Sequence, residues 1–304
     1  MTVQGRIIKG VGGLYTVLAE DGRTFECPAR GVFRLTGDTP FVGDHVTVRE
    51  DKDGCVLASI APRSSLLQRP PVANLDRALF VVSTVEPTPN LLILDRQLAI
   101  AECKGIDPVL IFTKCDLAPA DELAALYSHA GFQTVCVRPD QPCRDAVLPL
   151  LAGHVSALAG NSGVGKSTLL NAVLSGLRLE TGEISRKLGR GRHTTRHVEL
   201  YPVELPGARR GFVADTPGFS SWDAEHGELI VKQALARGFR EFAPYADDCR
   251  FTGCSHTREK GCAVLAAVAR GDIAKSRHDH YCALYEEVRH LAEWELKERD
   301  GVIR

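Results

Sequence analysis

The sequence lacks the segments that take a protein into or across a membrane. It contains no run of eighteen apolar residues, and its first residues do not form the apolar stretch of a signal peptide. Charge of one sign is not in excess: 37 basic residues face 38 acidic ones, so overall charge does not favour nucleic acid. Internal repeats and low-complexity segments are also missing. We therefore expect a globular protein of the cytoplasm that does not engage a membrane.

The cysteines do not follow the spacing of a disulfide framework. Most of the ten are scattered singly, which suits a reducing cytoplasm. Three are crowded together with a histidine, in the pattern Cys249-x4-Cys254-x-His256-x5-Cys262. Three thiolates and one imidazole complete a tetrahedral set for one structural Zn²⁺ per chain. Reduced, unliganded cysteines are the alternative, and His280 and Cys282 are alternative ligands.

Length and periodicity predict three domains, because 304 residues exceed one ordinary hydrophobic core. Residues 1–68 are expected to form an OB-type β-barrel, with an SH3-like barrel as the alternative. Asp-Gly turns separate pairs of its five predicted strands, which are Gly5–Lys9, Leu14–Ala19, Arg23–Cys27, His45–Glu50 and Cys55–Ile60. Arg69-Pro70-Pro71 is expected to be a linker. Residues 226–304 are expected to form a mainly helical, zinc-binding domain.

Residues 69–225 alternate between apolar strands and amphipathic helices. The predicted strands are Ala78–Val85, Pro108–Thr113, Thr134–Val137, Val155–Ala159 and Gly211–Ala214. The predicted helices are Asn90–Gly105, Ala120–Gly131, Asp145–Leu151 and Ser167–Ser175. This alternation is typical of an α/β domain, in which helices cover both faces of a mostly parallel sheet.

A phosphate-binding loop lies in this domain, between a predicted strand and a predicted helix. The pattern G-x-x-x-x-G-K-[ST] is matched by Gly160, Asn161, Ser162, Gly163, Val164, Gly165, Lys166, Ser167 and Thr168. Glycines allow backbone N–H groups to surround phosphates, and the helix N-terminus favours an anion. Lys166 is expected to reach the β- and γ-phosphates, and the Ser167 hydroxyl to ligate Mg²⁺.

The segment Asp215-Thr216-Pro217-Gly218 follows another apolar strand and predicts a second phosphate-sensing element. Asp215 would hold Mg²⁺ through water, and the Gly218 N–H would contact the γ-phosphate. Between the two motifs, Thr194 and Thr195 are candidates for a second hydroxyl ligand to Mg²⁺, and we favour Thr195. Their alternative role is to support a β-strand.

Guanine recognition is assigned to a segment that precedes the phosphate loop. Thr113-Lys114-Cys115-Asp116 is a variant of the Asn-Lys-x-Asp motif, and no such motif follows Gly218. The Asp116 carboxylate can accept hydrogen bonds from guanine N1–H and the 2-amino group, a pair that adenine lacks. Lys114 would lie along the base and brace the loop, and a final base contact is expected near residues 136–138. These motifs define a P-loop GTPase domain with a circularly permuted motif order.

A basic run leads into the two threonines and contains no acidic residue. Its members are Arg186, Lys187, Arg190, Arg192 and Arg196. The run is either a solvated face or an anion-binding surface. Phe219 occupies the position after Gly218 where Ras-like enzymes carry a water-orienting glutamine. His193 is our candidate for positioning that water, and contact with phosphate or RNA is its alternative role.

Together these motifs resemble the ribosome small-subunit-dependent GTPase A family of circularly permuted GTPases. The resemblance covers nearly the whole chain, through TKCD, GNSGVGKST, GRHTT (Gly191–Thr195), DTPGF and the cysteine–histidine cluster. The segments Ala29–Gly31 and Val42–Asp44 are similar to that family's OB domain. The resemblance implies GTP hydrolysis stimulated by the small (30S) ribosomal subunit during its late maturation, with rRNA contacts from the OB and zinc domains. Thr113 departs from the asparagine more common in the family.

Two other classes of function fit parts of the sequence. One is an RNA-binding module that uses GTP only as a conformational switch. The other is a phosphotransferase acting on a small molecule, which leaves the barrel and the cysteine cluster unexplained. We expect a monomeric GTPase that binds GTP or GDP with Mg²⁺ and has the small ribosomal subunit and its rRNA as partners.

Overall fold

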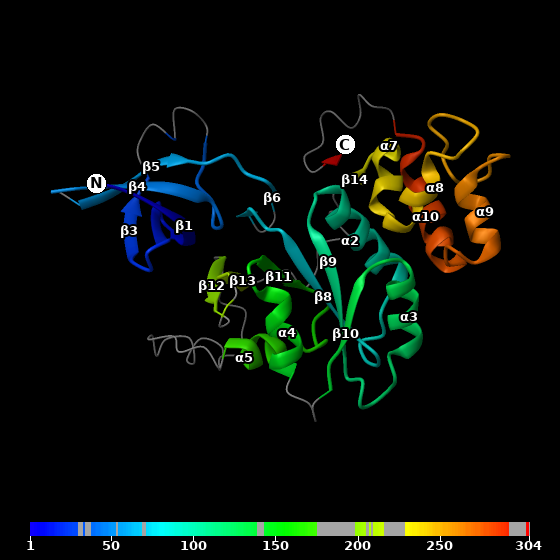
Figure 1. Cartoon of the computed structure of the whole chain (residues 1–304), viewed down its shortest axis with the longest axis horizontal. Helices are drawn as coiled ribbons and strands as arrows, with labels where there is room; N and C mark the ends of the chain where they lie inside the picture. The colour runs from blue at the N-terminus through cyan, green and yellow to red at the C-terminus, as the bar shows by residue number, and fades with distance from the viewer. Residues whose placement is uncertain are drawn as a thin grey trace. The chain divides into compact units, whose positions relative to one another are not determined.

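The computed structural model describes residues 1–29, 33, 38–52, 54–68, 71–138, 143–174, 198–204, 207, 209–215, 229–291 and 302–303. The chain divides into two compact parts, each drawn from several stretches of sequence (Figure 1). The first part comprises Met1–Arg77, Cys143–Leu158 and Lys166–Ser220. The second comprises Ala78–Pro142, Ala159–Gly165 and Ser221–Arg304. None of the helices in the described ranges combines the length and apolar character of a membrane span.

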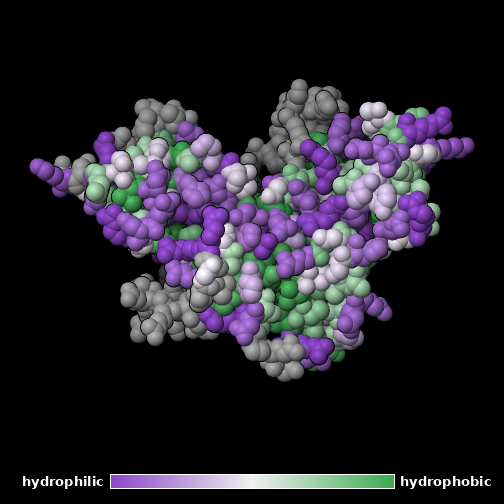
Figure 2. All heavy atoms as spheres, viewed as in Figure 1, coloured by the Kyte–Doolittle hydropathy of each residue, from purple (hydrophilic) through white to green (hydrophobic). Residues whose placement is uncertain are grey.

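The N-terminal strands close into the predicted five-stranded barrel. They are β1 (Thr2–Val11), β2 (Leu14–Ala19), β3 (Thr24–Pro28), β4 (His45–Asp51) and β5 (Gly54–Ile60). β1 pairs antiparallel with β2 and β4, and β2–β3 and β4–β5 are antiparallel hairpins. A parallel bridge between Ala29 and Leu57 joins the last two edges. Side chains alternate between the two faces of each strand, so apolar residues such as Ile7 and Val17 are fully buried inside the barrel. Hydrophilic residues cover much of its outer surface in Figure 2.

Two short paired strands follow the barrel, so the linker prediction was wrong at Pro71, while Arg69 and Pro70 lie outside the described residues. β6 (Leu66–Gln68) pairs antiparallel with β7 (Pro71–Ala73). A proline can occupy this place because it is the first residue of a short strand, where no ladder donor is required. This pair of strands packs closely on the barrel, since a Cβ on Gly43 would lie 1.9 Å from the Ala73 carbonyl oxygen.

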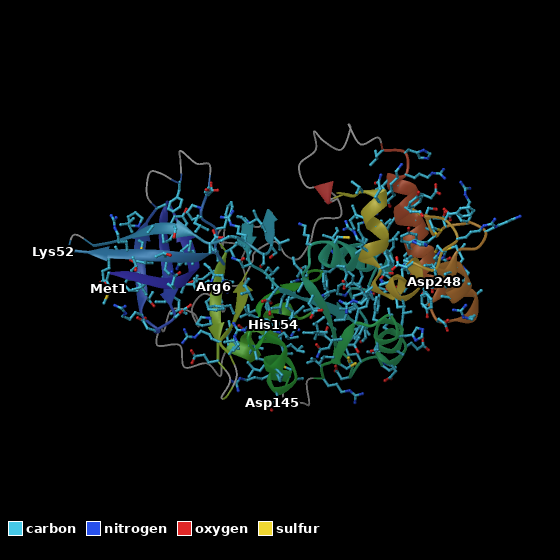
Figure 3. The ribbon with its side chains drawn as sticks, turned by 45° about the horizontal axis from the view of Figure 1, so that its top comes forward. Met1, Arg6, Lys52, Asp145, His154 and Asp248 are labelled. Carbon is cyan, nitrogen blue, oxygen red and sulfur yellow. The ribbon has the colours of Figure 1, made fainter. Side chains whose placement is uncertain are left out.

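The first part also contains a three-stranded sheet that continues into the barrel. β11 (Val155–Ala159) runs parallel to β13 (Gly211–Asp215), and β12 (Glu199–Val203) lies antiparallel to β13. The sequence did not predict β12, which also pairs with β1 at Glu199 and Lys9. The Arg6 guanidinium, labelled in Figure 3, lies 5.1 Å from the Phe212 ring centroid and strengthens this junction. Within the described residues of this part, helices α4 (Cys143–Leu151) and α5 (Lys166–Leu174) pack on each other.

The second part is built on three adjacent strands, in the order β10 (Gln133–Cys136), β9 (Asp107–Thr113) and β8 (Arg77–Ser83). β9 and β10 are parallel, as predicted. Helices α2 (Leu91–Cys103) and α3 (Asp121–His129) belong to the same part. The Asn90 side chain caps α2 by accepting a hydrogen bond from the Ile93 N–H at 3.2 Å.

The C-terminal segment is mainly helical, with one exception. Its elements are β14 (Leu229–Ile230), α7 (Lys232–Leu235), η1 (Ala236–Gly238), η2 (Arg240–Phe242), α8 (Ala243–Ala246), α9 (Ala263–Arg270), α10 (Lys275–Val288) and β15 (Val302–Ile303). The exception is the parallel pairing of β14 with β15, which returns the end of the chain to the start of this segment (Figure 1).

A buried ion network attaches the C-terminal helices to α2. Arg277 on α10 donates to Asp95 on α2 at 2.6 Å and to Glu241 on η2 at 2.7 and 3.0 Å. The Tyr127 hydroxyl and the His280 ring also contact Asp95, at 2.9 and 2.6 Å. Burial alone would lower the pKa of Arg277, but the two carboxylates outweigh it and raise the pKa above its ordinary value. The cation is therefore held fully charged inside the protein.

Candidate nucleotide site and metal centre

The phosphate loop has the backbone shape that an anion cradle requires. Gly160 has φ of 139°, and a Cβ at this position would lie 2.3 Å from the Val81 carbonyl oxygen. Only glycine fits so close to the neighbouring strand. Gly163 and Gly165 also have positive φ, of 82° and 102°. Val164 is 3% exposed and anchors the loop, whereas Asn161, Ser162 and Gly163 are exposed and accessible to a ligand.

Helix α5 begins at the lysine that ends this motif. Lys166 is partly buried, and burial lowers the pKa of its ammonium group. Ser167 and Thr168 follow in the first turn and are exposed. The remainder of the helix is held by buried apolar side chains, Leu169, Leu170, Val173 and Leu174. The first turn therefore offers a cation, two hydroxyls and the positive end of a helix dipole.

The predicted guanine motif contacts the phosphate loop directly. Thr113 is the last residue of β9, and its hydroxyl donates to the Val164 carbonyl oxygen at 2.7 Å. The next residue, Lys114, has φ of 59°, and its ammonium donates to the Glu86 carbonyl oxygen. Asp116 is exposed. The sequence did not reveal the role of Thr113, because a threonine at a strand end carries no signal of a partner that follows 51 residues later.

The end of β10 lies beside this motif, where a final base contact was expected. The Val137 N–H donates to the Phe112 carbonyl oxygen at 2.7 Å. The Cys115 thiol donates to the same oxygen at 3.3 Å and also contacts the Cys136 thiol. Burial raises the pKa of Cys115 to about 11. Cys136 and Arg138 are exposed at the same sheet edge as Asp116.

Asp215 ends β13, the strand next to the one that leads into the phosphate loop. The parallel register pairs Ala214 with Ala157, so the Asp215 backbone follows at the carboxyl end of the sheet. Its side chain lies outside the described part of the structure. The other predicted residues of this region also lie outside the described residues: Arg186, Lys187, Arg190, Arg192, His193, Thr194, Thr195, Arg196, Thr216, Pro217, Gly218 and Phe219.

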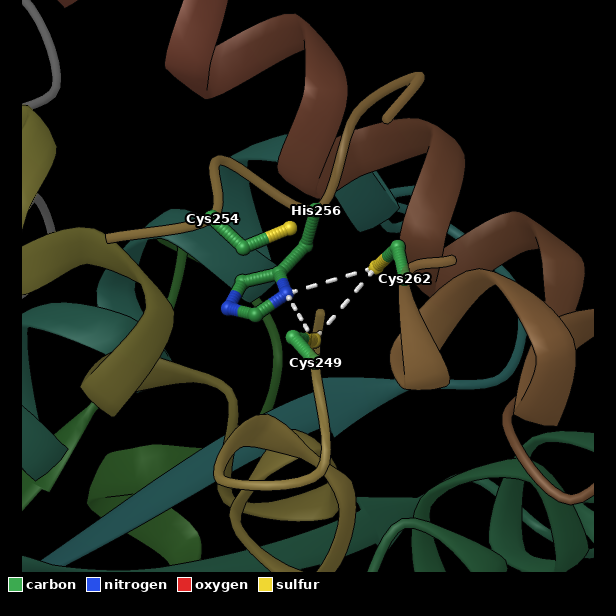
Figure 4. A group of neighbouring side chains, drawn as sticks. All are labelled: Cys249, Cys254, His256 and Cys262. Carbon is green, nitrogen blue, oxygen red and sulfur yellow. Dashed lines mark hydrogen bonds between the residues drawn. The ribbon is translucent and has the colours of Figure 1, made fainter. Parts of the chain in front are cut away.

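The cysteine–histidine pattern folds into one compact cluster (Figure 4). One ligand atom from each of Cys249, Cys254, His256 and Cys262 lies within 4.8 Å of all the others. The His256 Nδ1 atom is 3.5 Å from the sulfurs of Cys249 and Cys262, which are 3.8 Å apart. The two alternative ligands are used elsewhere: the Cys282 thiol contacts His278, and His280 contacts Asp95.

The loops that carry the cluster are held by hydrogen bonds rather than by regular structure. His256 has the left-handed φ of 56°, and its carbonyl oxygen contacts His278 Nε2 at 2.8 Å. The Tyr281 hydroxyl donates to the Ser255 carbonyl oxygen at 2.7 Å. The Glu259 carboxylate accepts hydrogen bonds from the backbone N–H groups of Ser255 and Thr257 at 2.9 and 3.2 Å. Burial raises the pKa of Glu259, but hydrogen bonds from the Ser255 hydroxyl and from the N–H groups of Ser255, Arg258 and Glu259 outweigh it and lower the pKa to about 2.

Two families match separate stretches of the chain. Residues 60–225 match the family described as RsgA GTPase, and residues 4–56 match the RsgA N-terminal domain. A relative in Geobacillus thermodenitrificans, named small ribosomal subunit biogenesis GTPase RsgA, is 43% identical over 94% of this chain and 97% of its own length. A relative of the same name in Shouchella clausii is 44% identical, also over 94% and 97%.

Two solved structures share the fold. YjeQ from Thermotoga maritima has a TM-score of 0.80 at 31% identity, covering 96% of this chain and all of its own. YloQ, described as a circularly permuted GTPase, has a TM-score of 0.78 at 32% identity, covering 95% of this chain and 96% of its own. The predicted architecture of barrel, permuted α/β domain and helical C-terminal segment is confirmed. Matched over nearly its full length by these relatives and structures, the chain belongs to the RsgA GTPase family.

Proposed function

We propose that this protein hydrolyses GTP during the maturation of the small ribosomal subunit. The relatives that match nearly the whole chain are named for this process. The observation that carries the proposal is the 2.7 Å hydrogen bond from Thr113 to Val164, because it joins the guanine motif to the phosphate loop in one compact part. Because ribosomal subunits mature in the cytoplasm, we place the protein there, with the small subunit as its partner.

The nucleotide is bound from both of its ends. The exposed carboxylate of Asp116 would accept hydrogen bonds from guanine N1–H and the 2-amino group, and Lys114 would lie along the base. Selection against adenine by ~10⁴ is within reach of such a polar pair. Backbone N–H groups of residues 160–165 hold the phosphates, and Lys166 reaches the β- and γ-phosphates.

A Mg²⁺ ion bound with GTP or GDP would neutralise negative charge on the phosphates. Its protein ligands are proposed to be the Ser167 hydroxyl, the Thr195 hydroxyl in preference to that of Thr194, and Asp215 through water. The Gly218 N–H contacts the γ-phosphate and reports its presence.

The attacking water needs a positioning group, and we assign His193. Phe219 follows Gly218 and has no hydrogen-bonding side chain. An imidazole can accept the proton of a water near neutral pH. Binding of the subunit to the basic run around His193 would bring the imidazole to the water, and a catalytic group completed by a partner can add ~10³–10⁵ in rate. Single-turnover hydrolysis by His193→Ala with saturating subunits tests the assignment. A full stimulated rate in this variant would remove His193 from the mechanism.

The decisive measurement is hydrolysis of GTP and ATP with and without purified 30S particles. We expect slow turnover of GTP alone, strong stimulation by the particles and little turnover of ATP. Asp116→Asn should weaken GTP and admit xanthine nucleotide, because the amide donates where guanine also donates. Turnover that the particles do not change would favour the alternative, an RNA-binding module that uses GTP only as a switch.

The cysteine–histidine cluster is proposed to hold one structural Zn²⁺. Tetrahedral zinc with bonds of about 2.3 Å to sulfur and 2.0–2.1 Å to nitrogen separates two sulfurs by about 3.8 Å and a sulfur from a nitrogen by about 3.5 Å. The distances among Cys249, His256 and Cys262 match both values. Four protein ligands leave no open position, so the ion stabilises the fold and takes no part in hydrolysis.

The loops around this cluster offer a surface for the phosphates and bases of rRNA. Arg250, Arg258 and Lys260 are exposed there, and Phe251 is 50% exposed with the Arg250 guanidinium 5.4 Å from its ring centroid. Asp248, labelled in Figure 3, is exposed next to Cys249, so the surface is not uniformly basic. The barrel supplies a second surface, and a monomer is sufficient to present both. Charge reversal of Arg258 and Lys260 should weaken subunit binding and reduce its salt dependence.

A further inference from the structure

Two cysteines of the barrel form a close thiol pair that neither the nucleotide site nor the metal centre uses. The Sγ atoms of Cys27 on β3 and Cys55 on β5 are 3.1 Å apart. This is closer than the 3.8 Å between Cys249 and Cys262 in the metal cluster. Within the described ranges, Cys27 and Cys55 belong to no group of three or more metal-ligating side chains. Their proximity therefore points to sulfur chemistry rather than to a second metal.

The pair spans the seam at which the barrel closes. Ala29 and Leu57 form a parallel bridge there, and two residues earlier on each strand Cys27 faces Cys55. Neighbouring strands lie about 4.7–4.9 Å apart. That spacing falls within the Cα–Cα range of about 4.4–6.8 Å that a disulfide bridges. Bond formation therefore needs only that the two sulfurs approach by about 1 Å.

The two thiols differ in exposure and in hydrogen bonding, and these differences indicate which one reacts first with an oxidant. Cys27 is 0% exposed, and its S–H donates to the Cys55 sulfur. Cys55 is partly exposed, and its own S–H donates to the Glu26 carbonyl oxygen at 3.1 Å. Burial and the neighbouring thiol raise the pKa of Cys27 to about 12, so Cys27 stays protonated and remains a donor. Cys55 is therefore the thiol of the pair that an oxidant reaches first from solvent.

We propose that Cys27 and Cys55 are a redox modification site, in which a hydroperoxide oxidises Cys55 and Cys27 then closes a reversible disulfide. The Cys55 sulfur attacks one oxygen of hydrogen peroxide, the O–O bond breaks, and a sulfenic acid forms, while the other oxygen leaves as water with the Cys55 proton. The Cys27 sulfur attacks the Cys55 sulfur, the S–O bond breaks, and hydroxide leaves as water with the Cys27 proton. With hydrogen peroxide, two thiols lose two electrons and two waters form. A small thiol reverses the reaction.

The disulfide would fix the seam of the barrel. It would link β3 to β5 covalently and close a ring across residues 27–55, which restricts the unfolded chain more than the folded one. We expect the oxidised protein to melt about 5 °C or more above the reduced protein. Cytosolic disulfides of this kind are transient and redox-responsive rather than permanent.

The test uses the full-length chain with hydrogen peroxide in graded doses. After quenching, free thiols are blocked, and peptides are mapped by mass spectrometry with and without dithiothreitol. We expect a peptide pair joined through Cys27 and Cys55, within one chain, at doses that leave the partly exposed Cys143 reduced. Dithiothreitol should remove the link.

Two variants assign the order of the steps. In Cys55→Ser, the buried Cys27 should stay reduced at the same dose. In Cys27→Ser, Cys55 should accumulate sulfenic acid, which dimedone traps. Free thiols at both positions when Cys143 is already oxidised would overturn the proposal, as would a link from either cysteine to another partner. If either variant fails to fold, the peptide map of the unaltered chain decides alone.

Discussion

The guanidinium of Arg277 and the carboxylate of Asp95 lie 2.6 Å apart, and both side chains are 1% exposed. Asp95 belongs to α2, which packs on the strand that leads into the predicted guanine motif. Arg277 belongs to α10, and its neighbour His278 contacts the carbonyl oxygen of His256 in the cysteine–histidine cluster. The two regions are thus joined by a charge pair that water does not reach. Removing either partner would leave the other charge buried and uncompensated, so the C-terminal helices and α2 depend on each other's side chains.

Arg277→Met should lower the free energy of unfolding by about 3–5 kcal/mol, because Asp95 and Glu241 would stay buried without their cation. Urea denaturation measures the change. The matched control is Arg270→Met, since Arg270 pairs with Asp272 in solvent, at 56% and 40% exposure. The control should change stability by less than about 1 kcal/mol. Equal effects of the two substitutions would contradict a special role for the buried pair.

Thr113→Val should weaken GDP and GTP binding by about tenfold, because the Val164 carbonyl oxygen loses its donor and the phosphate loop loses its brace. Thr113→Ser keeps the hydroxyl and should bind nearly as well as the unaltered chain. Fluorescence titration with a labelled guanine nucleotide compares the three proteins. If the valine and serine variants bind equally, the hydrogen bond does not support the site.

Elemental analysis should find one zinc per chain, and Cys254→Ala or a strong chelator should remove it. Loss of the ion should lower the melting temperature of the C-terminal segment, since metal binding there contributes to folding. Cys282→Ala is the control, because this thiol lies close in sequence but outside the cluster. A metal-free protein that melts normally would exclude a structural ion.

The Glu259 carboxylate should contribute a pH-dependent stabilisation. Its folded pKa of about 2 lies below the ordinary value of 4.5. The contribution is therefore complete above pH 4.5 and is lost as the pH falls toward 2. Glu259→Gln should melt below the unaltered chain at pH 7, and the difference should shrink in acid. Both proteins keep the same metal ligands, so release of metal by acid affects both melting curves. A difference that does not vary with pH would assign the effect to packing.

Local patterns were sufficient to predict the elements that present the site. Asp-Gly turns, strand-length apolar runs and the glycine-rich loop each act within a few residues, so β2 was predicted at its observed bounds and α5 to within one residue of them. The cysteine–histidine cluster was equally clear, because its ligands lie within fourteen consecutive residues. The roles assigned to Thr194, Thr195 and His193 remain predictions, because these residues lie outside the described part of the structure.

Features that depend on distant partners were not visible in the sequence. An arginine in a helix is normally exposed, and Arg277 is buried only because Asp95 and Glu241 reach it from 182 and 36 residues away. Strand β12 was not predicted for a related reason. Its partner β1 lies far away in the sequence, since Glu199 pairs with Lys9. The strand that begins at Pro71 was not predicted, because consecutive prolines usually interrupt a β-strand.

The position of β12 has a consequence for solubility. A strand at the edge of a sheet offers unpaired N–H and C=O groups to other chains and promotes aggregation. In the described structure β12 pairs with β13 on one side and meets β1 on the other, where Lys9 and Glu199 form an ion pair at 3.4 Å. A fragment that begins after residue 68 would leave that side uncovered, and we expect it to self-associate. The barrel thereby protects the edge of the sheet from pairing with other chains. This role is separate from any binding of RNA by the barrel.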